Sequence, residues 1–536
     1  MRLRMWTYDL AREQAPTHAY LHKLCKLSVE NGYNALGLYL EHRFAYPSAP
    51  WAAGKESLRP ETIRDLQSEF PDLQIIPFIN LLGHFEGFLY TEEGQRFACE
   101  RFKGMQADPT NDEFLSLCRK LIDDTVEVFN SEIIHIGGDE TQQLGRGQNS
   151  LARVEEYEKS GITDGKAELY GRHFGPLAEY VSSLGRTPAV WGDMFFDHPE
   201  ALDCLPKETM IFDWQYFSSP EHTSKLFRDK GFRTVFSPTL HTYNSIWCHL
   251  PQSERNVREH AEAAARLDAE GVCVTTWECG LFGNYNTILP AIEASGHILA
   301  NAVAGQDQAK VNPDAALAES IQEYASIIEA DGFVRQYLKH GENHEEWARL
   351  IGCELPALGG IWGFSGIRSS IKCRLFLYGN PFLLWLRNRD DLYGPKGKAA
   401  LELSERALPF ASSADQRGVC QLIRKSVEFV HYAELAHQAY ADRKPGEAIT
   451  HLSPCRQIFE DLEKVASANH INSCGSMADV YRCRAARRHV EEVILRIKHY
   501  GDGSLGYMPS FETLTHPKFM PHDQANWWLI NSWANE

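Results

Sequence analysis

Short apolar runs alternate with longer amphipathic segments along about the first 300 residues. Most of the short runs are almost continuously apolar, as expected for strands that are covered on both faces. The segments between them, such as 17–32 and 111–129, carry apolar residues at helical spacing and end near a glycine, an asparagine or a charged turn. We predict eight strands, at residues 3–8, 33–40, 73–79, 132–137, 187–192, 209–214, 232–237 and 272–277.

Eight strand–helix units of this length predict an α/β fold, a (β/α)8 TIM barrel over residues 1–305. The alternative is an open, doubly wound sheet, which favours a glycine-rich turn after its first strand. Here that turn reads YDLAREQ and contains no glycine. The barrel is therefore the better prediction.

The pattern changes near Gly305, and residues 306–536 predict an all-α C-terminal domain. Segment 419–435 shows the helical spacing clearly, because Val419, Leu422 and Val430 fall on one face. Three tryptophans of the last thirty residues are expected to dock an ordered tail, namely Trp527, Trp528 and Trp533.

Charge and composition exclude several classes of function. A formal net charge of −18 argues against a nucleic-acid or anionic-membrane partner. No apolar run approaches the roughly 20 residues that a membrane-spanning helix needs, and the opening MRLRMWTYDL lacks the apolar core of a signal peptide. The 13 cysteines are scattered without a C-x-x-C pair, which predicts reduced thiols and a cytoplasmic protein. No metal and no cofactor is expected.

The ends of the predicted strands carry the candidate chemistry, because the active site of such a barrel forms there. In EIIHIGGDETQQ, the fourth strand ends in Asp139 and Glu140. Adjacent carboxylates repel, and burying either is costly, so the pair is interpreted as functional. Other strand ends carry further carboxylates and tryptophans, a combination typical of a carbohydrate site; they include Glu41, Glu86, Asp193, Asp213, Trp191, Trp214 and Trp277.

HIGGDE at 135–140 matches the H-x-G-G-D-E motif of glycoside hydrolase family 20, the β-N-acetylhexosaminidases. The longer match, IIPFINLLGHFEGFL followed by IIHIGGDETQQLGRG, most resembles the hexosaminidase D branch. The resemblance covers the barrel alone. It implies a retaining exo-β-N-acetylhexosaminidase that releases terminal GalNAc and/or GlcNAc. In this family the substrate's own acetamide oxygen attacks C1 and forms an oxazolinium intermediate.

The resemblance also implies roles for particular residues. Glu140 corresponds to the general acid and then base, and Asp139 to the carboxylate that orients the acetamide N–H. Neighbouring strand residues point to opposite faces, so both can reach one ligand only where the strand breaks, which Gly137 and Gly138 help permit. The substrate-binding residues that it implies are Arg4 and Glu278 for hydroxyls, His84 to support the acid, Tyr243 for the acetamide oxygen, and Trp191, Trp214 and Trp277 around the acetamide methyl.

Departures from the family pattern keep alternatives open. Asn80 stands where I-P-E-I-D carries an acidic residue, and Trp277 and Glu278 are adjacent. The first predicted strand begins at residue 3, so the α/β domain that often precedes this barrel is not expected. One alternative is a β-glycosidase for unacetylated amino sugars, with Asp193 or Glu278 as nucleophile. Another is a barrel that binds glycans without cleaving them. A homodimer through the helical domain is a further hypothesis, based on the size of that domain and its late tryptophans.

Overall fold

The computed structural model describes residues 1–12, 14–100, 105–242, 247–277, 285–302, 332–340, 343–358, 380–472 and 478–516. The chain forms two compact units. The first comprises Met1–Leu240, Glu254–Trp277 and Ile292–Lys310, and the second comprises His241–Ser253, Glu278–Ala291 and Val311–Glu536.

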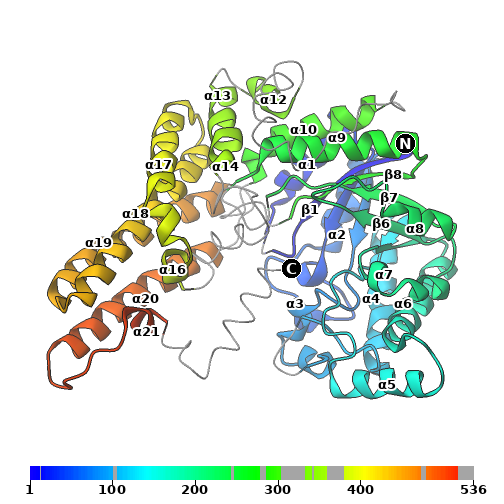
Figure 1. Cartoon of the computed structure of the whole chain (residues 1–536). Coiled ribbons are helices and arrows are strands. Elements are labelled where there is room, and N and C mark those ends of the chain that lie inside the picture. The colour runs from blue at the N-terminus through cyan, green and yellow to red at the C-terminus, as the bar shows by residue number, and fades with distance from the viewer. Residues whose placement is uncertain are drawn as a thin grey trace. The chain divides into compact units, whose positions relative to one another are not determined.

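The first unit contains a closed barrel of eight parallel strands, as predicted, in the order β1 to β8 (Figure 1). Strand β8 pairs with β1 and closes it. The strands are β1 (Leu3–Asp9), β2 (Ala35–Tyr39), β3 (Gln74–Phe78), β4 (Ile133–His135), β5 (Thr187–Trp191), β6 (Met210–Trp214), β7 (Arg233–Ser237) and β8 (Gly271–Val274).

Apolar side chains fill the interior of the barrel. Met5, Ile76, Phe78, Phe212 and Val235 belong to one buried cluster there. Helices cover the outer faces of the strands (Figure 1), so the strands are buried on both sides and their sequences are nearly continuously apolar.

Helices follow the strands of this barrel, and their starts obey ordinary capping rules. Thr17 caps α1 by accepting a hydrogen bond from the backbone of Tyr20, and Asn111 caps α4 in the same way. The helices of this part of the chain are α1 (His18–Glu30), α2 (Pro60–Glu69), α3 (Glu86–Leu89), α4 (Asp112–Val128), α5 (Gln148–Lys159), α6 (Gly165–Ser183), α7 (Met194–Asp197), α8 (Ser224–Asp229), α9 (Leu250–Arg266) and α10 (Leu289–Asn301).

The described residues beyond 310 form helices and no strand, as the sequence predicts. Long helices α18, α19 and α20 pack side by side (Figure 1). The helices are α12 (Phe333–Leu338), α13 (His344–Arg349), α14 (Leu355–Ala357), α16 (Phe382–Leu392), α17 (Pro395–Ala407), α18 (Ala414–Ala441), α19 (Pro445–Asn472), α20 (Ala478–Gly501) and α21 (Phe511–Thr515). The predicted tail with Trp527, Trp528 and Trp533 lies outside the described residues. Within the described ranges, no helix is both long and apolar enough to cross a membrane.

Candidate active site

Strand β4 ends early, and its end places the paired carboxylates. The strand stops at His135, and the two glycines that follow adopt positive φ angles, +83° at Gly137 and +105° at Gly138. A Cβ at Gly137 would lie 2.7 Å from Oδ1 of Asn80, and one at Gly138 would lie 2.4 Å from the Tyr170 hydroxyl. Only glycine fits both positions. The predicted break in the strand before the carboxylates is confirmed.

His84 contacts both carboxylates. Its Nε2 lies 3.0 Å from Oε2 of Glu140 and 3.5 Å from Oδ2 of Asp139. The side chain of Asp139 is 12% exposed, whereas that of Glu140 is 48% exposed. His84 and Glu140 both have positive φ angles, +49° and +47°. Such backbone strain in non-glycine residues is typical of functional sites.

The imidazole of His84 carries positive charge into this group. Burial alone lowers its pKa, but the charge of Asp139, the hydrogen bond to Glu140 and the Glu86 carboxylate 3.9 Å away hold the pKa of His84 well above its usual value. The same contact acts on Glu140. Burial opposes its ionisation, yet the hydrogen bond and charge of His84, together with the charge of Arg12, hold the pKa of Glu140 below its usual range.

Two aspartates beside Glu140, the buried Asp139 and the half-buried Asp193, resist ionisation. Burial and the charge of Glu140 raise the pKa of Asp139 to about 6, against the lowering effect of His84. Burial and the charge of Asp139 raise the pKa of Asp193 to about 8. Asp193 Oδ2 accepts the backbone N–H of Glu140 at 2.9 Å, and its Oδ1 accepts the indole N–H of Trp214 at 3.2 Å. Asp193 therefore holds the loop after β4 in place.

His135, the first residue of the HIGGDE motif, is a core residue. Its ring stacks on Phe78 at a centroid distance of 4.3 Å and is fully buried. Burial lowers the pKa of His135 well below its usual value, so the ring is neutral. It supports the barrel beneath the site.

The structure does not bring Arg4 to this group. Arg4 lies near the amino-terminal end of β1, at the opposite end of the strand from the carboxylates, and its Nε donates to the carbonyl of Gly32 at 2.7 Å. The prediction for Arg4 fails because a residue at the start of a barrel strand cannot reach the mouth.

Arg12 lies at the mouth instead, in the loop that follows β1. Its Nη1 is 3.5 Å from Oδ1 of Asp9 and 3.6 Å from Oε1 of Glu41, and its guanidinium lies over the rings of Tyr39 and Trp277 at 5.0 and 5.8 Å. Arg12 is the functional candidate that the sequence reasoning missed. The sequence does place Arg12 just after the predicted end of the first strand, where the active site of such a barrel forms.

The three predicted tryptophans occupy one aromatic region. The ring of Trp277 lies 5.8 Å from that of Trp191 and 4.8 Å from that of Tyr39, and its Nε1 donates to the Tyr216 hydroxyl at 2.6 Å. Trp214 lies 4.9 Å from Tyr216. Trp277 and Trp214 are partly exposed, but Trp191 is fully buried. Trp191 therefore forms the base of this region.

Two predicted residues, Tyr243 and Glu278, lie outside the described residues.

Glu41, His84 and Glu86 form a cluster whose ligand atoms all lie within 4.8 Å of one another, and they could hold a metal ion. The Arg12 guanidinium, 3.6 Å from Glu41, opposes a further cation at this point. The positive charges of His84 and Arg12 already compensate for the two carboxylates there.

Residues 74–274 match the model of the glycosyl hydrolase family 20 catalytic domain. This segment contains the paired carboxylates, His84 and two of the three tryptophans. The chain is a glycoside hydrolase, and the resemblance drawn from HIGGDE is confirmed over this segment.

Several solved structures are similar to the chain. One is the β-N-acetylhexosaminidase from Bacteroides fragilis, at 15% identity and a TM-score of 0.45, with 61% of this chain and 71% of that chain covered. Another is the family 20 exo-β-N-acetylglucosaminidase from Vibrio harveyi in complex with N-acetylglucosamine, at 17% identity and a TM-score of 0.45, with 58% and 56% covered. A third is the Flavobacterium johnsoniae chitobiase, at 14% identity and a TM-score of 0.49, with 87% and 78% covered. A comparison with curated protein sequences finds no match.

Proposed function

We propose that the protein is a retaining exo-β-N-acetylhexosaminidase that releases terminal GalNAc and/or GlcNAc through an oxazolinium intermediate. The observation that carries this proposal is the pairing of Asp139 and Glu140 at the broken end of β4, with His84 in contact with both. With a pKa of about 6, Asp139 is mostly ionised near neutral pH, as the orienting role requires. The pKa of Glu140 is lowered, so Glu140 must receive its proton from the charged His84 before it can act as an acid.

Glu140 is the proposed general acid, because it is the more exposed of the two and can reach a leaving oxygen. The charged His84 beside it is the proposed proton partner in the resting enzyme. Asp139 is the proposed acceptor of the acetamide N–H. Its ionised form would also stabilise the positive charge that develops on the oxazolinium ring.

The aromatic region around Trp277 and Trp214 is the proposed pocket for the acetamide methyl, with Trp191 beneath it. Arg12 takes the hydroxyl-binding role that the sequence assigned to Arg4, because it is the arginine that lies over Tyr39 and Trp277. Tyr243 and Glu278 keep their proposed roles toward the acetamide oxygen and a hydroxyl.

A protein nucleophile fits this site less well. Of the two candidate nucleophiles, Asp193 and Glu278, Asp193 lies within the described residues. Its two carboxyl oxygens accept the N–H groups of Glu140 and Trp214, and its pKa of about 8 keeps it protonated near neutral pH. A protonated, fully engaged carboxyl is a poor nucleophile. A non-catalytic glycan-binding barrel would have no use for the strained, charged group at Glu140 and His84.

Progressive fluorination of the acetamide methyl in a nitrophenyl β-N-acetylglucosaminide tests the proposal. Fluorine withdraws electrons from the carbonyl oxygen, so kcat should fall steeply from acetyl to monofluoro-, difluoro- and trifluoroacetyl. A protein nucleophile would leave kcat nearly constant across the series, and that result would overturn the proposal.

Membership of the hexosaminidase D branch is a finer proposal, which rests on IIPFINLLGHFEGFL and IIHIGGDETQQLGRG. A homodimer through the helical region is supported by Tyr481 and Leu495 of α20, which are 59% and 64% exposed. Light scattering that finds a monomer at micromolar concentration would rule it out.

A cytoplasmic location is likewise a proposal. Ten cysteines of the described residues are free thiols, which suits a reducing compartment. Microscopy of the tagged full chain tests it.

A further inference from the structure

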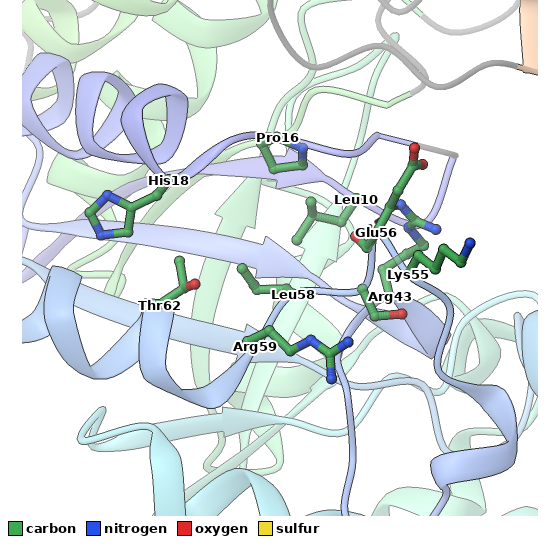
Figure 2. Close-up of a pocket in the computed structure, with 10 residues that line it drawn as sticks. Leu10, Pro16, His18, Arg43, Lys55, Glu56, Leu58, Arg59 and Thr62 are labelled. Carbon is green, nitrogen blue, oxygen red and sulfur yellow. Dashed lines mark hydrogen bonds between the residues drawn. The ribbon is translucent and has the colours of Figure 1, made fainter.

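A pocket of about 180 Å³ lies between the first two loops that follow barrel strands (Figure 2). Leu10, Pro16 and Leu58 give it an apolar wall, and Arg43, Lys55 and Arg59 give it a basic side. Figure 2 shows His18 at one end of the pocket and the three basic residues toward the other. The pocket thus combines a small apolar surface with concentrated positive charge.

This positive charge is unusual in a chain with a net charge of −18. Lys55 and Arg59 are exposed and, within the described part of the chain, form no ion pair or side-chain hydrogen bond. Glu56 is the single carboxylate among the described residues that line the pocket. Lys55 and Arg59, two neighbouring cations without a carboxylate partner in the described part of the chain, attract an anion.

The start of helix α2 adds to this attraction. No side chain caps α2, its first residue is a proline, and Arg59 occupies the capping position. Thr62, in the first turn, lines the pocket. The N–H groups of an uncapped first turn and the helix dipole both favour a negatively charged ligand.

Arg43 holds the two loops together. Its Nη2 donates to the carbonyl of Gln14 at 2.9 Å and faces the carbonyl of Glu56 at 3.5 Å. The same two loops carry Arg12 and Glu41 of the candidate active site. The pocket is therefore built into the rim of the barrel mouth.

We propose that this pocket binds a tetrahedral oxyanion, a phosphate or sulfate group, either as a free ion or carried on a sugar. Arg43, Lys55, Arg59 and the start of α2 supply the donors and the positive charge. Leu10, Pro16 and Leu58 would contact the CH face of a sugar that carries the group.

Calorimetric titration of the full chain with sodium sulfate and with sodium phosphate, at constant ionic strength, tests the proposal. We expect saturable binding that weakens by about tenfold or more in the Lys55→Gln/Arg59→Gln double variant, since each lost cation removes a charge-assisted contact. Both residues are exposed, so the variant should fold normally. Lys26→Gln/Arg64→Gln is the matched control, because it removes the same charge from exposed residues paired with Glu30 and Glu127.

No saturable binding, or equal binding by the double variant and the wild-type chain, would overturn the proposal. Turnover of a 6-sulfated and an unsulfated nitrophenyl N-acetylglucosaminide distinguishes a free anion from one that is carried on a sugar. A higher kcat/KM for the sulfated substrate, lost in the double variant, identifies a sugar-borne group. Equal kcat/KM, with sulfate raising the Tm of the wild-type chain alone, identifies a free ion. Binding is measured without turnover, so a failure here is distinct from a failure of the proposed function.

Discussion

At the scale of single residues, the site depends on how three ionisable groups share charge. His84 lies within 3.5 Å of both Asp139 and Glu140. Its positive charge compensates for two adjacent carboxylates that would otherwise be costly to bury together. The pKa of Asp139 is raised to about 6, whereas that of Glu140 is lowered. The two neighbours are therefore chemically different, although their side chains are similar.

The proposed roles predict different behaviour for two isosteric variants. Glu140→Gln cannot protonate a leaving group, so its kcat/KM should fall about 10²- to 10⁴-fold on leaving groups of high pKa and far less on nitrophenols. Asp139→Asn should lose activity on every acetamido substrate, whatever the leaving group. A leaving-group series measured for both variants checks this. Parallel losses across the series would contradict the roles.

His84 predicts a change in the pH profile. Its charge lowers the pKa of Asp139, so His84→Gln should raise that pKa above about 6. If activity requires ionised Asp139, the acid limb of kcat/KM should move to higher pH in the variant, because more base is then needed to ionise the group. The pH–rate profiles of both proteins measure the shift. An acid limb that stays in place would show that His84 acts only as a structural contact.

At the scale of elements, the short strand β4 and the loop after it define the site. Gly137 and Gly138 leave the strand with positive φ angles, and the Tyr170 hydroxyl donates to the carbonyl of Gly138 at 2.7 Å. Asp193 then anchors the backbone of Glu140. These contacts turn both carboxylates toward one mouth, which a continuing strand would prevent.

Gly138→Ala tests this geometry. Its Cβ would lie 2.4 Å from the Tyr170 hydroxyl and would require a positive φ, so we expect a loss of about 2–4 kcal/mol in the free energy of unfolding and a large loss of activity. Gly161→Ala is the control. Gly161 has a φ of +98°, but no atom lies within 4 Å of a Cβ placed there. The control therefore measures the cost of backbone strain alone, which we expect to lower the free energy of unfolding by about 1–2 kcal/mol.

Tyr170→Phe, combined with Gly138→Ala, removes the clashing oxygen and should recover part of the lost stability. Urea unfolding of the wild-type chain, the two single variants and the double variant measures the coupling. Additive losses for Gly138→Ala and Tyr170→Phe would mean that the contact with Tyr170 does not restrict position 138.

Much of this architecture could be predicted from the sequence. All eight strands appear within a few residues of their predicted positions, because strands buried on both faces leave long apolar runs. The break after β4 was also readable, since two glycines precede the carboxylates. The sequence does not distinguish Arg12 from Arg4, because it does not show how the loop after the first strand places Arg12 over Tyr39. The anchoring of Glu140 by Asp193 joins two loops far apart in the sequence and leaves no local pattern.

At the scale of the whole molecule, the raised pKa of Asp193 makes the free energy of unfolding depend on pH. Asp193 has a pKa of about 8 in the folded chain, against about 3.9 when unfolded. Between these values the folded chain holds a proton that the unfolded chain has released. The free energy of unfolding therefore falls by up to about 1.4 kcal/mol per pH unit as the pH rises from about 4 to about 8.

Asp193→Asn removes this titration. We expect the wild-type chain to lose stability relative to the variant steadily between about pH 4 and pH 8, and the gap to stay constant above about pH 8. Urea unfolding at several pH values compares the two proteins. Curves that run parallel over this range would contradict the raised pKa of Asp193.

The most direct test of the central claim is turnover of four nitrophenyl β-glycosides side by side: the N-acetylglucosaminide, the N-acetylgalactosaminide, the glucoside and the galactoside. The proposed substrate-assisted mechanism predicts strong turnover of the two acetamido sugars alone, and their ratio gives the sugar preference. Comparable turnover of the plain glucoside or galactoside would contradict the account, because Asp139 would then have no acetamide to orient.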